Sequence, residues 1–180
     1  MLAIVPFKGL DGAKTRLAAE LSREERARLA LEMLERVLAA CAGATSIGRT
    51  LLVTPDPGAA PAGVDVLVDE GEGHAQAIAL ALRDPRARAG VVIVMADCPL
   101  AQADALDALA EAADPLALVE ARDGGVNALA LHDPARFTPS FGIPAAETLA
   151  RARTAGIEPV VLDDERLSLD VDRPEDLAFA

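Results

Sequence analysis

The stretch Gly90-Val-Val-Ile-Val-Met-Ala96 is the strongest buried-strand signal in the chain. It is a continuous apolar run, without the alternation of apolar and polar residues that marks a half-buried strand. Such a run is typical of a strand covered on both faces of a sheet. Asp97-Cys98-Pro99 follows directly. The stretch therefore predicts a central strand of an α/β sheet, with a carboxylate at the strand's carboxyl end.

Strands and helices alternate on both sides of this stretch. Strand signals cover 2–7, 50–54, 64–68, 116–121, 126–131, 159–162 and 167–171, and helical signals cover 22–42, 73–82, 101–113, 144–155 and a last segment from Pro174. This alternation predicts an α/β sandwich with a mainly parallel sheet. The two successive strands within 116–131 predict an antiparallel portion. Because no linker or repeat divides the chain, residues 1–180 are expected to form a single domain.

The composition argues against several kinds of partner. The chain has 180 residues and a net charge of −12, with neither Trp nor Tyr. An acidic surface repels nucleic acid and anionic lipid, and the lack of Trp and Tyr argues against stacking of bases. No stretch approaches the roughly 18 consecutive apolar residues of a membrane span. We expect no nucleic acid or membrane partner, and a cytoplasmic protein whose two cysteines, Cys41 and Cys98, are buried free thiols.

A glycine-rich loop with basic side chains follows the first predicted strand. Lys8 and Lys14 lie in this loop, and Arg16 is close by. The two lysines are the only ones among the 17 basic residues of the chain. Glycines let the backbone approach a ligand, and ammonium groups neutralise phosphate oxygens. The loop therefore predicts a polyphosphate site, although its spacing matches neither a Walker loop nor a dinucleotide-binding turn. An exposed, solvated loop with incidental charge is the alternative interpretation.

Acidic side chains follow two of the predicted strands. Asp97 ends the central strand and is well placed to bind Mg²⁺, which takes one or two carboxylates together with substrate phosphates. Asp170 and Asp172 are two positions apart, so on a strand both would point to the same face and invite a cation. The alternatives are an ordinary strand-ending aspartate for Asp97 and a helix N-terminus decorated with acids for the second group.

Three weaker signals lie at other predicted strand and helix ends. Gly73 and Gln76 belong to a glycine-led helix start suited to a base or ribose, whereas His74 alone is more often a surface residue. Asn127 could place an amide against a ligand or belong only to a hairpin. Gly142 precedes a helix whose N-terminus could hold a phosphate or carboxylate.

Seven short motifs, taken together, resemble the CofC family of guanylyltransferases, which act in the biosynthesis of the deazaflavin coenzyme F-420. They occur in the family's order across nearly the whole chain. The motifs are Pro6-Phe-Lys8, Ala13-Lys-Thr-Arg-Leu17, Val53-Thr-Pro-Asp56, Ala96-Asp-Cys-Pro-Leu100, Val126-Asn-Ala-Leu129, Phe141-Gly142 and Leu169-Asp-Val-Asp-Arg-Pro-Glu-Asp-Leu177.

The resemblance implies a Rossmann-like three-layer sandwich of the glycosyltransferase-A type found in nucleotidyltransferases. It also implies transfer of GMP from GTP to the phosphate of phospholactate, phosphoenolpyruvate or phosphoglycerate, with Mg²⁺ or Mn²⁺ as cofactor, and a possible homodimer. The implied catalytic residues are Lys8, Lys14, Arg16 and Asp97. The implied nucleotide-binding residues are Pro6, Phe7, Lys8, Lys14, Arg16, Gly73 and Gln76, the acceptor-binding residues are Asn127 and Gly142, and the metal ligands are Asp97, Asp172 and Asp170.

The sequence departs from the family pattern around the expected acceptor. Val126 and Ala145 stand where the family usually has hydroxyl side chains, and Gly73-His-Ala75 replaces a usual Gly-Leu-Asn. These departures leave undecided which acid accepts the nucleotide and which base the nucleotide carries. Two alternatives remain: a related CTP or GTP transferase acting on a sugar phosphate or a pterin, and a non-catalytic nucleotide-binding protein.

Overall fold

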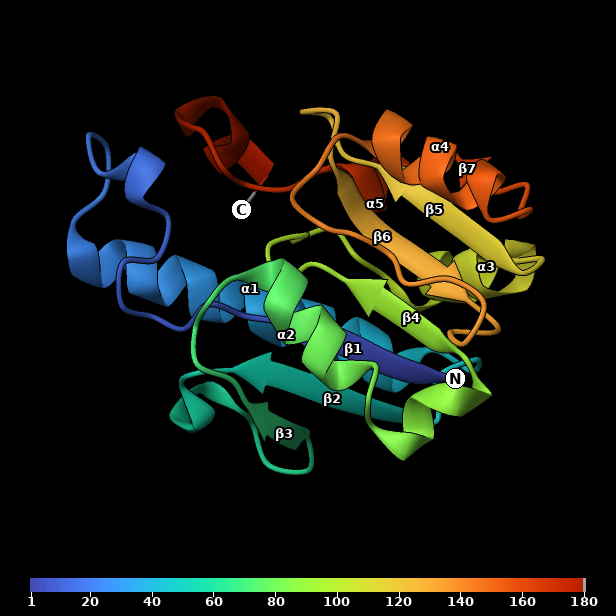
Figure 1. The fold of residues 1–180 in the computed structure, drawn as a ribbon. Helices are drawn as coiled ribbons and strands as arrows, with labels where there is room; N and C mark the ends of the chain where they lie inside the picture. Colours follow the sequence, from blue (N-terminus) through green and yellow to red (C-terminus); the bar gives the residue numbers. More distant parts are fainter. Residues whose placement is uncertain (180) are drawn as a thin grey trace.

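A computed structural model describes residues 1–179 of the chain. Seven strands form one sheet in the order β3-β2-β1-β4-β6-β5-β7 (Figure 1). The strands are β1 (Leu2–Pro6), β2 (Arg49–Thr54), β3 (Asp65–Val68), β4 (Val91–Val94), β5 (Leu116–Glu120), β6 (Val126–Leu131) and β7 (Val160–Leu162). The helices are α1 (Arg23–Gly43), α2 (His74–Ala81), α3 (Ala103–Ala112), α4 (Ala145–Thr154) and α5 (Glu165–Ser168).

The antiparallel portion lies where the sequence predicts it. Strand β6 runs antiparallel to both of its neighbours, β4 and β5, and all other neighbouring strands pair in parallel. The predicted α/β class with a mainly parallel sheet is confirmed. Among the described residues, no helix has the length and apolar character needed to cross a bilayer.

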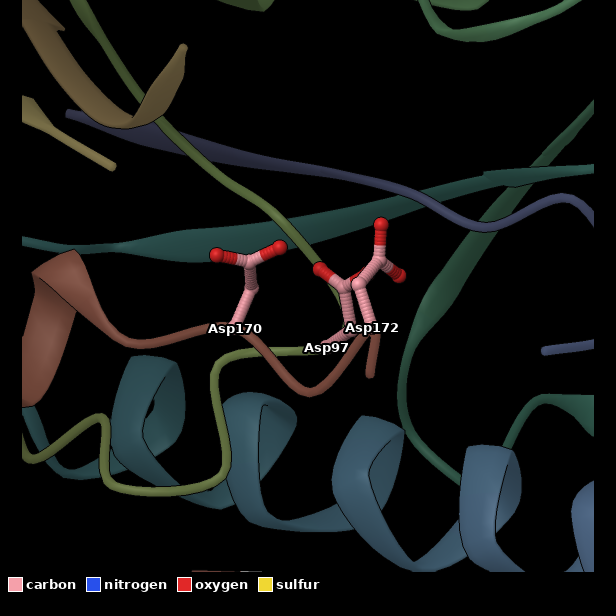
Figure 2. Close-up of side chains that lie close together, drawn as sticks. All are labelled: Asp97, Asp170 and Asp172. Carbon is pink, nitrogen blue, oxygen red and sulfur yellow. The ribbon is translucent and has the colours of Figure 1, made fainter. Parts of the chain in front are cut away.

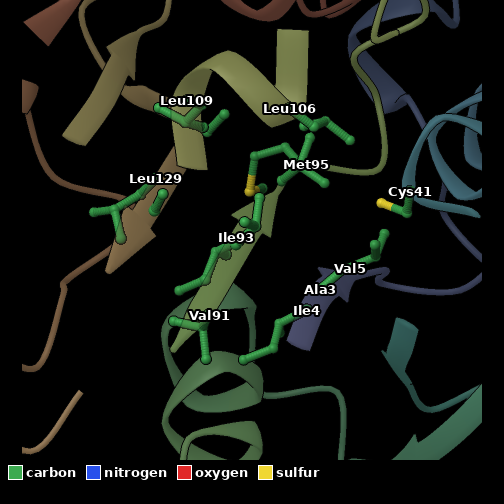
Figure 3. Close-up of a cluster of buried hydrophobic side chains, with 14 of the residues drawn as sticks. Ala3, Ile4, Val5, Cys41, Val91, Ile93, Met95, Leu106, Leu109 and Leu129 are labelled. Atoms are coloured by element: carbon green, nitrogen blue, oxygen red, sulfur yellow. The ribbon is translucent and has the colours of Figure 1, made fainter. Parts of the chain in front are cut away.

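Helices cover both faces of the sheet. Helix α1 begins at a capping box, in which the Ser22 hydroxyl accepts from the Glu25 amide while the Glu25 carboxylate accepts from the Ser22 amide. Helices α1 and α3 pack together on one face, and α2 lies over β1 and β2 on the other (Figure 1). Figure 3 shows part of the resulting core, with Cys41 on α1 and Ile93 on β4 among its buried side chains.

Both cysteines are free and fully buried, as the sequence predicts. Burial raises the pKa of the Cys41 thiol to about 12, so little of the reactive thiolate exists at neutral pH. We therefore expect neither thiol to react with Ellman's reagent in the folded protein at pH 8, and both to react once the protein is unfolded in guanidinium. Rapid reaction of a thiol in the folded protein would contradict this packing.

The strand predicted over 167–171 is wrong. The Asp164 carboxylate accepts from the amides of Arg166 and Leu167 and so starts the short helix α5. After α5 the chain crosses the end of β4 instead of pairing along the sheet, because the Val171 amide donates to the Asp97 carbonyl at 3.2 Å. The last predicted helix, from Pro174, is present as a 3-10 helix over Pro174–Phe179.

The connections of the sheet predict where a ligand binds. The chain leaves β1 to build β2 and β3 on one side, and then crosses to the other side of β1 to form β4. In open α/β sheets, ligands bind at the carboxyl ends of the strands where the strand order changes direction. This point lies between β1 and β4, and the glycine-rich loop after β1 and Asp97 after β4 both meet there.

Candidate active site

Lys14 lies at the centre of the site. Its ammonium Nζ donates to Asp97 Oδ2 at 2.6 Å and to Asp172 Oδ1 at 2.9 Å. The alternative interpretation of this loop as exposed and solvated does not fit Lys14, whose side chain is only 10% exposed. Lys14 also has φ 48°, and among residues 1–179 it is the one non-glycine residue with positive φ. This left-handed conformation is costly for a lysine, and the side chain that it carries points to the carboxylates.

Three carboxylates from distant parts of the chain converge beside Lys14. One oxygen each of Asp97, Asp170 and Asp172 lies within 4.8 Å of the other two. Figure 2 shows the three side chains projecting to the same side, Asp97 from the loop after β4 and the other two from the segment after α5. Hard divalent cations prefer such oxygen donors, so the arrangement fits Mg²⁺ or Mn²⁺. The three predicted metal ligands are therefore brought together, although Asp170 and Asp172 do not lie on a strand.

The charges of this cluster are strongly coupled. Burial acts to lower the pKa of Lys14, but the charges of Asp97 and Asp172 outweigh it and raise that pKa. Burial likewise acts to raise the pKa of Asp172, but Lys14 and Arg16 outweigh it and lower that pKa. The Arg16 guanidinium donates to the second Asp172 oxygen at 2.9 Å. Lys14 and Asp172 are therefore both held in their charged forms.

Asp170 differs from the other two carboxylates. Burial raises its pKa to about 6, against a hydrogen bond from Asn127, and the charges of Asp97 and Asp172 act in the same direction as burial. The Asn127 amide Nδ2 donates to Asp170 Oδ1 at 3.2 Å and to the Ser168 carbonyl at 3.1 Å. Asn127 therefore fixes the position of Asp170, a contact the sequence did not predict.

A cavity of about 380 Å³ opens above this cluster. Three cationic side chains line it, so it combines positive charge from the loop with two of the three carboxylates. The predicted residues that line it are Pro6, Phe7, Lys8, Lys14, Arg16, Asp97 and Asp172. The predicted polyphosphate loop and two of the three predicted cation ligands thus share one cavity.

His74, treated in the sequence as an ordinary surface residue, also lines this cavity. Burial and the neighbouring Lys8 charge lower the pKa of His74 to about 4, so its imidazole is neutral at pH 7. A neutral imidazole can donate to or accept from a ligand without adding charge. Its place directly after Gly73 was the available signal, but a single histidine at a helix start is not specific.

The remaining predicted residues lie outside this cavity lining. Gly73 is the residue before α2, with φ 104° and open space where a side chain would begin. Gln76 lines a second pocket of about 280 Å³ along α2, with Asp69, Glu70 and Glu72. Gly142, with φ 81°, lies in the loop before α4.

The comparisons with known proteins decide the family. The family model described as "Guanylyl transferase CofC like" matches residues 1–179. The chain belongs to this family. The resemblance carried by the seven sequence motifs is thereby confirmed for the CofC-like chain.

Curated relatives of this CofC-like chain carry names with different acceptor acids. It is 38% identical to a phosphoenolpyruvate guanylyltransferase of Sphaerobacter thermophilus, over 98% of this chain and 90% of the relative. It is 36% identical to a 3-phospho-D-glycerate guanylyltransferase of Phenylobacterium zucineum, over 97% and 86%. It is 35% identical to a 2-phospho-L-lactate guanylyltransferase of Methanosphaerula palustris, over 98% and 81%.

Solved structures share the fold of the CofC-like chain. A nucleotidyl transferase from Methanothermobacter matches with a TM-score of 0.68 and 16% identity, over 98% of this chain and 94% of that one. A Mycobacterium tuberculosis protein in complex with manganese matches with a TM-score of 0.60 and 20% identity, over 98% and 95%. The expected nucleotidyltransferase type of sandwich is therefore confirmed.

Proposed function

We propose that the protein transfers GMP from GTP to the phosphate of a phosphorylated three-carbon acid and releases pyrophosphate, as a step in the biosynthesis of coenzyme F-420. The observation that carries the proposal is the juxtaposition in one cavity of Lys8, Lys14 and Arg16 with the carboxylates of Asp97 and Asp172. A triphosphate needs the cationic side chains, and a metal ion bound with it needs the carboxylates.

In this reaction an oxygen of the acceptor phosphate attacks the α-phosphorus of GTP in line. The new phosphorus–oxygen bond forms as the bond from the α-phosphorus to the bridging oxygen of the β-phosphate breaks, and pyrophosphate leaves. Phosphoryl-type transfer asks the protein mainly for positioning and charge stabilisation. Lys8, Lys14 and Arg16 would hold the triphosphate and offset the negative charge that builds up on the leaving pyrophosphate.

The cation ligands in this proposal are Asp97, Asp170 and Asp172. A bound Mg²⁺ or Mn²⁺ would supply positive charge to the phosphate oxygens at the reacting centre. Asn127 holds Asp170 in place through its hydrogen bond at 3.2 Å. Gly73 and Gln76 are assigned to the base or ribose by their place at the start of α2, whose first residue, His74, lines the cavity.

The acceptor acid is assigned to the space near Asn127 and Gly142. Asn127 contacts Asp170, and Gly142 precedes α4, whose first residue Ala145 donates its amide to the Gly124 carbonyl in the turn between β5 and β6. Val126 and Ala145, where hydroxyls are expected, are both buried. Each missing hydrogen bond to a charged group would weaken binding of the family's usual acids by roughly 1.5–3 kcal/mol.

The double variant Val126→Thr/Ala145→Ser is expected to raise kcat/KM for phosphoenolpyruvate and phospholactate by about tenfold or more, because it restores two hydroxyl donors. Phosphoglycerate, which carries a hydroxyl of its own, is the first acid to test as the preferred acceptor of the natural protein. The control is Val161→Thr, which adds a hydroxyl on the exposed edge strand β7. Efficient use of phosphoenolpyruvate by the natural protein, with no gain in the double variant, would point to backbone amides near Gly142 instead.

The proposed function is tested by pyrophosphate release in a panel of triphosphates and acceptors. We expect release with GTP and Mg²⁺ that depends on one of the three acids. Release with CTP and a sugar phosphate, and none with GTP and any of the acids, would assign the protein to a different transferase. Tight GTP binding without any acceptor-dependent release of pyrophosphate would identify the protein as a non-catalytic nucleotide-binding protein.

A further inference from the structure

The position of the Lys14 ammonium carries an inference that rests on the proposed function. Nζ lies among the carboxylates that would bind a divalent cation, at 2.6 Å from Asp97 and 2.9 Å from Asp172. We infer that Lys14 occupies the cation site of the nucleotide-free protein and leaves it only when a triphosphate binds. Lys14 would then be a positioning residue that makes metal binding depend on the nucleotide.

The ammonium and a metal ion cannot use these oxygens together. Mg²⁺ binds oxygen at about 2.0–2.1 Å, so it would displace the hydrogens that Nζ directs at Asp97 Oδ2 and Asp172 Oδ1. The two cations would also repel each other at such a short separation, since the Lys14 side chain is only 10% exposed to water. Metal binding through these two oxygens of the nucleotide-free protein therefore has to break two ionic hydrogen bonds of Lys14.

The alternative partner for the ammonium lies in the same cavity. Lys14 lines the cavity together with Lys8 and Arg16, where the phosphate oxygens would sit. Its four-carbon side chain is flexible, and an ammonium can exchange carboxylate oxygens for phosphate oxygens without a demanding geometry. Binding of the triphosphate would draw Lys14 away and open the site, so nucleotide and metal would each strengthen binding of the other.

Lys8 provides the matched comparison. It lines the same cavity and carries the same charge, but it makes no ion pair with a carboxylate among the described residues. A general effect of positive charge would act from both lysines, whereas occupation of the cation site is possible only for Lys14.

The test is Mn²⁺ binding followed by electron paramagnetic resonance, without nucleotide, in the natural protein, Lys14→Met, Lys14→Arg and Lys8→Met. We expect Lys14→Met to bind Mn²⁺ about tenfold more tightly or better, and Lys8→Met, which removes a charge that acts on Asp172 only through space, to gain clearly less, about threefold at most. Lys14→Arg, which keeps the charge, should bind Mn²⁺ with an affinity close to that of the natural protein. An unchanged affinity in Lys14→Met, or an equal gain in Lys8→Met, would overturn the inference.

A second measurement needs no variant. Because the chain has only two lysines, labelling lysine with carbon-13 at Cε gives two resolvable side-chain signals in NMR. We expect the Lys14 signal to move when Mg²⁺ and GTP are added together and to stay in place at the same low concentration of Mg²⁺ alone. If product forms while the Lys14 signal never moves, the inference fails and the proposed function stands. If no acid supports product formation but the Mn²⁺ results are as expected, the proposed function fails instead.

Discussion

Replacing Asp97 with asparagine is expected to lower kcat for the transfer by about a thousandfold while leaving the fold unchanged. The amide keeps the shape of the side chain and one acceptor oxygen, but it removes the negative charge that a divalent cation needs. The Asp97 side chain is 23% exposed, so the loss of charge is not expected to unfold the protein. Steady-state kinetics and a thermal melt of the variant measure the two effects separately.

The comparison variants for Asp97→Asn lie on the segment after β7. Asp163→Asn removes the same charge at an exposed position outside the cavity lining and should leave kcat unchanged. Asp172→Asn should reduce kcat more than Asp170→Asn, because Asp172 lines the cavity and contacts both Lys14 and Arg16. The reverse order would make Asp170 the more important of these two ligands, and full activity in excess chelator would contradict the metal assignment.

Replacing Lys14 with alanine is expected to lower kcat/KM by about a hundredfold to a thousandfold. The variant removes a cation that would neutralise the leaving pyrophosphate. It also leaves Asp97 and Asp172 close together without their shared partner, so the melting temperature should fall modestly. Lys14→Arg should recover only part of the activity, because a planar guanidinium cannot take the place of a compact ammonium.

The control for Lys14→Ala is Arg88→Ala, which removes an exposed cation outside the cavity lining. It should leave kcat/KM within about twofold of the natural protein, as is usual for surface positions. If Lys14→Ala changed kcat/KM as little as Arg88→Ala does, the phosphate site would have to be centred on Lys8 and Arg16 instead.

The sequence predicts the sheet well because its signals are local. The apolar run that ends at Ala96 and the alternation of strands and helices can both be recognised from residues that are neighbours in the sequence. Asp97 and the two lysines can also be identified from local sequence, because Asp97 directly follows one buried strand and the lysines follow another. Parallel strands then bring their carboxyl ends together, so the meeting of these groups follows from the fold class.

The sequence does not predict features that depend on contacts between distant residues. Asp170 and Asp172 converge on Asp97 because the segment after α5 crosses the end of β4, not because they share a strand. Lys14 forms ion pairs with Asp97, 83 positions along the chain, and with Asp172, 158 positions along the chain. His74 enters the cavity only through the placement of α2 over β1 and β2. None of these contacts leaves a local pattern along the chain.

The most direct test of the proposed transfer is the identity of the product, measured by phosphorus-31 NMR of a reaction with GTP, Mg²⁺ and each of the three acids. Transfer of GMP to the acid predicts free pyrophosphate and two new coupled signals from a diphosphate that joins guanosine to the acid. Formation of GDP, with the terminal phosphate moved to the acid or to water, would contradict transfer of the nucleotidyl group.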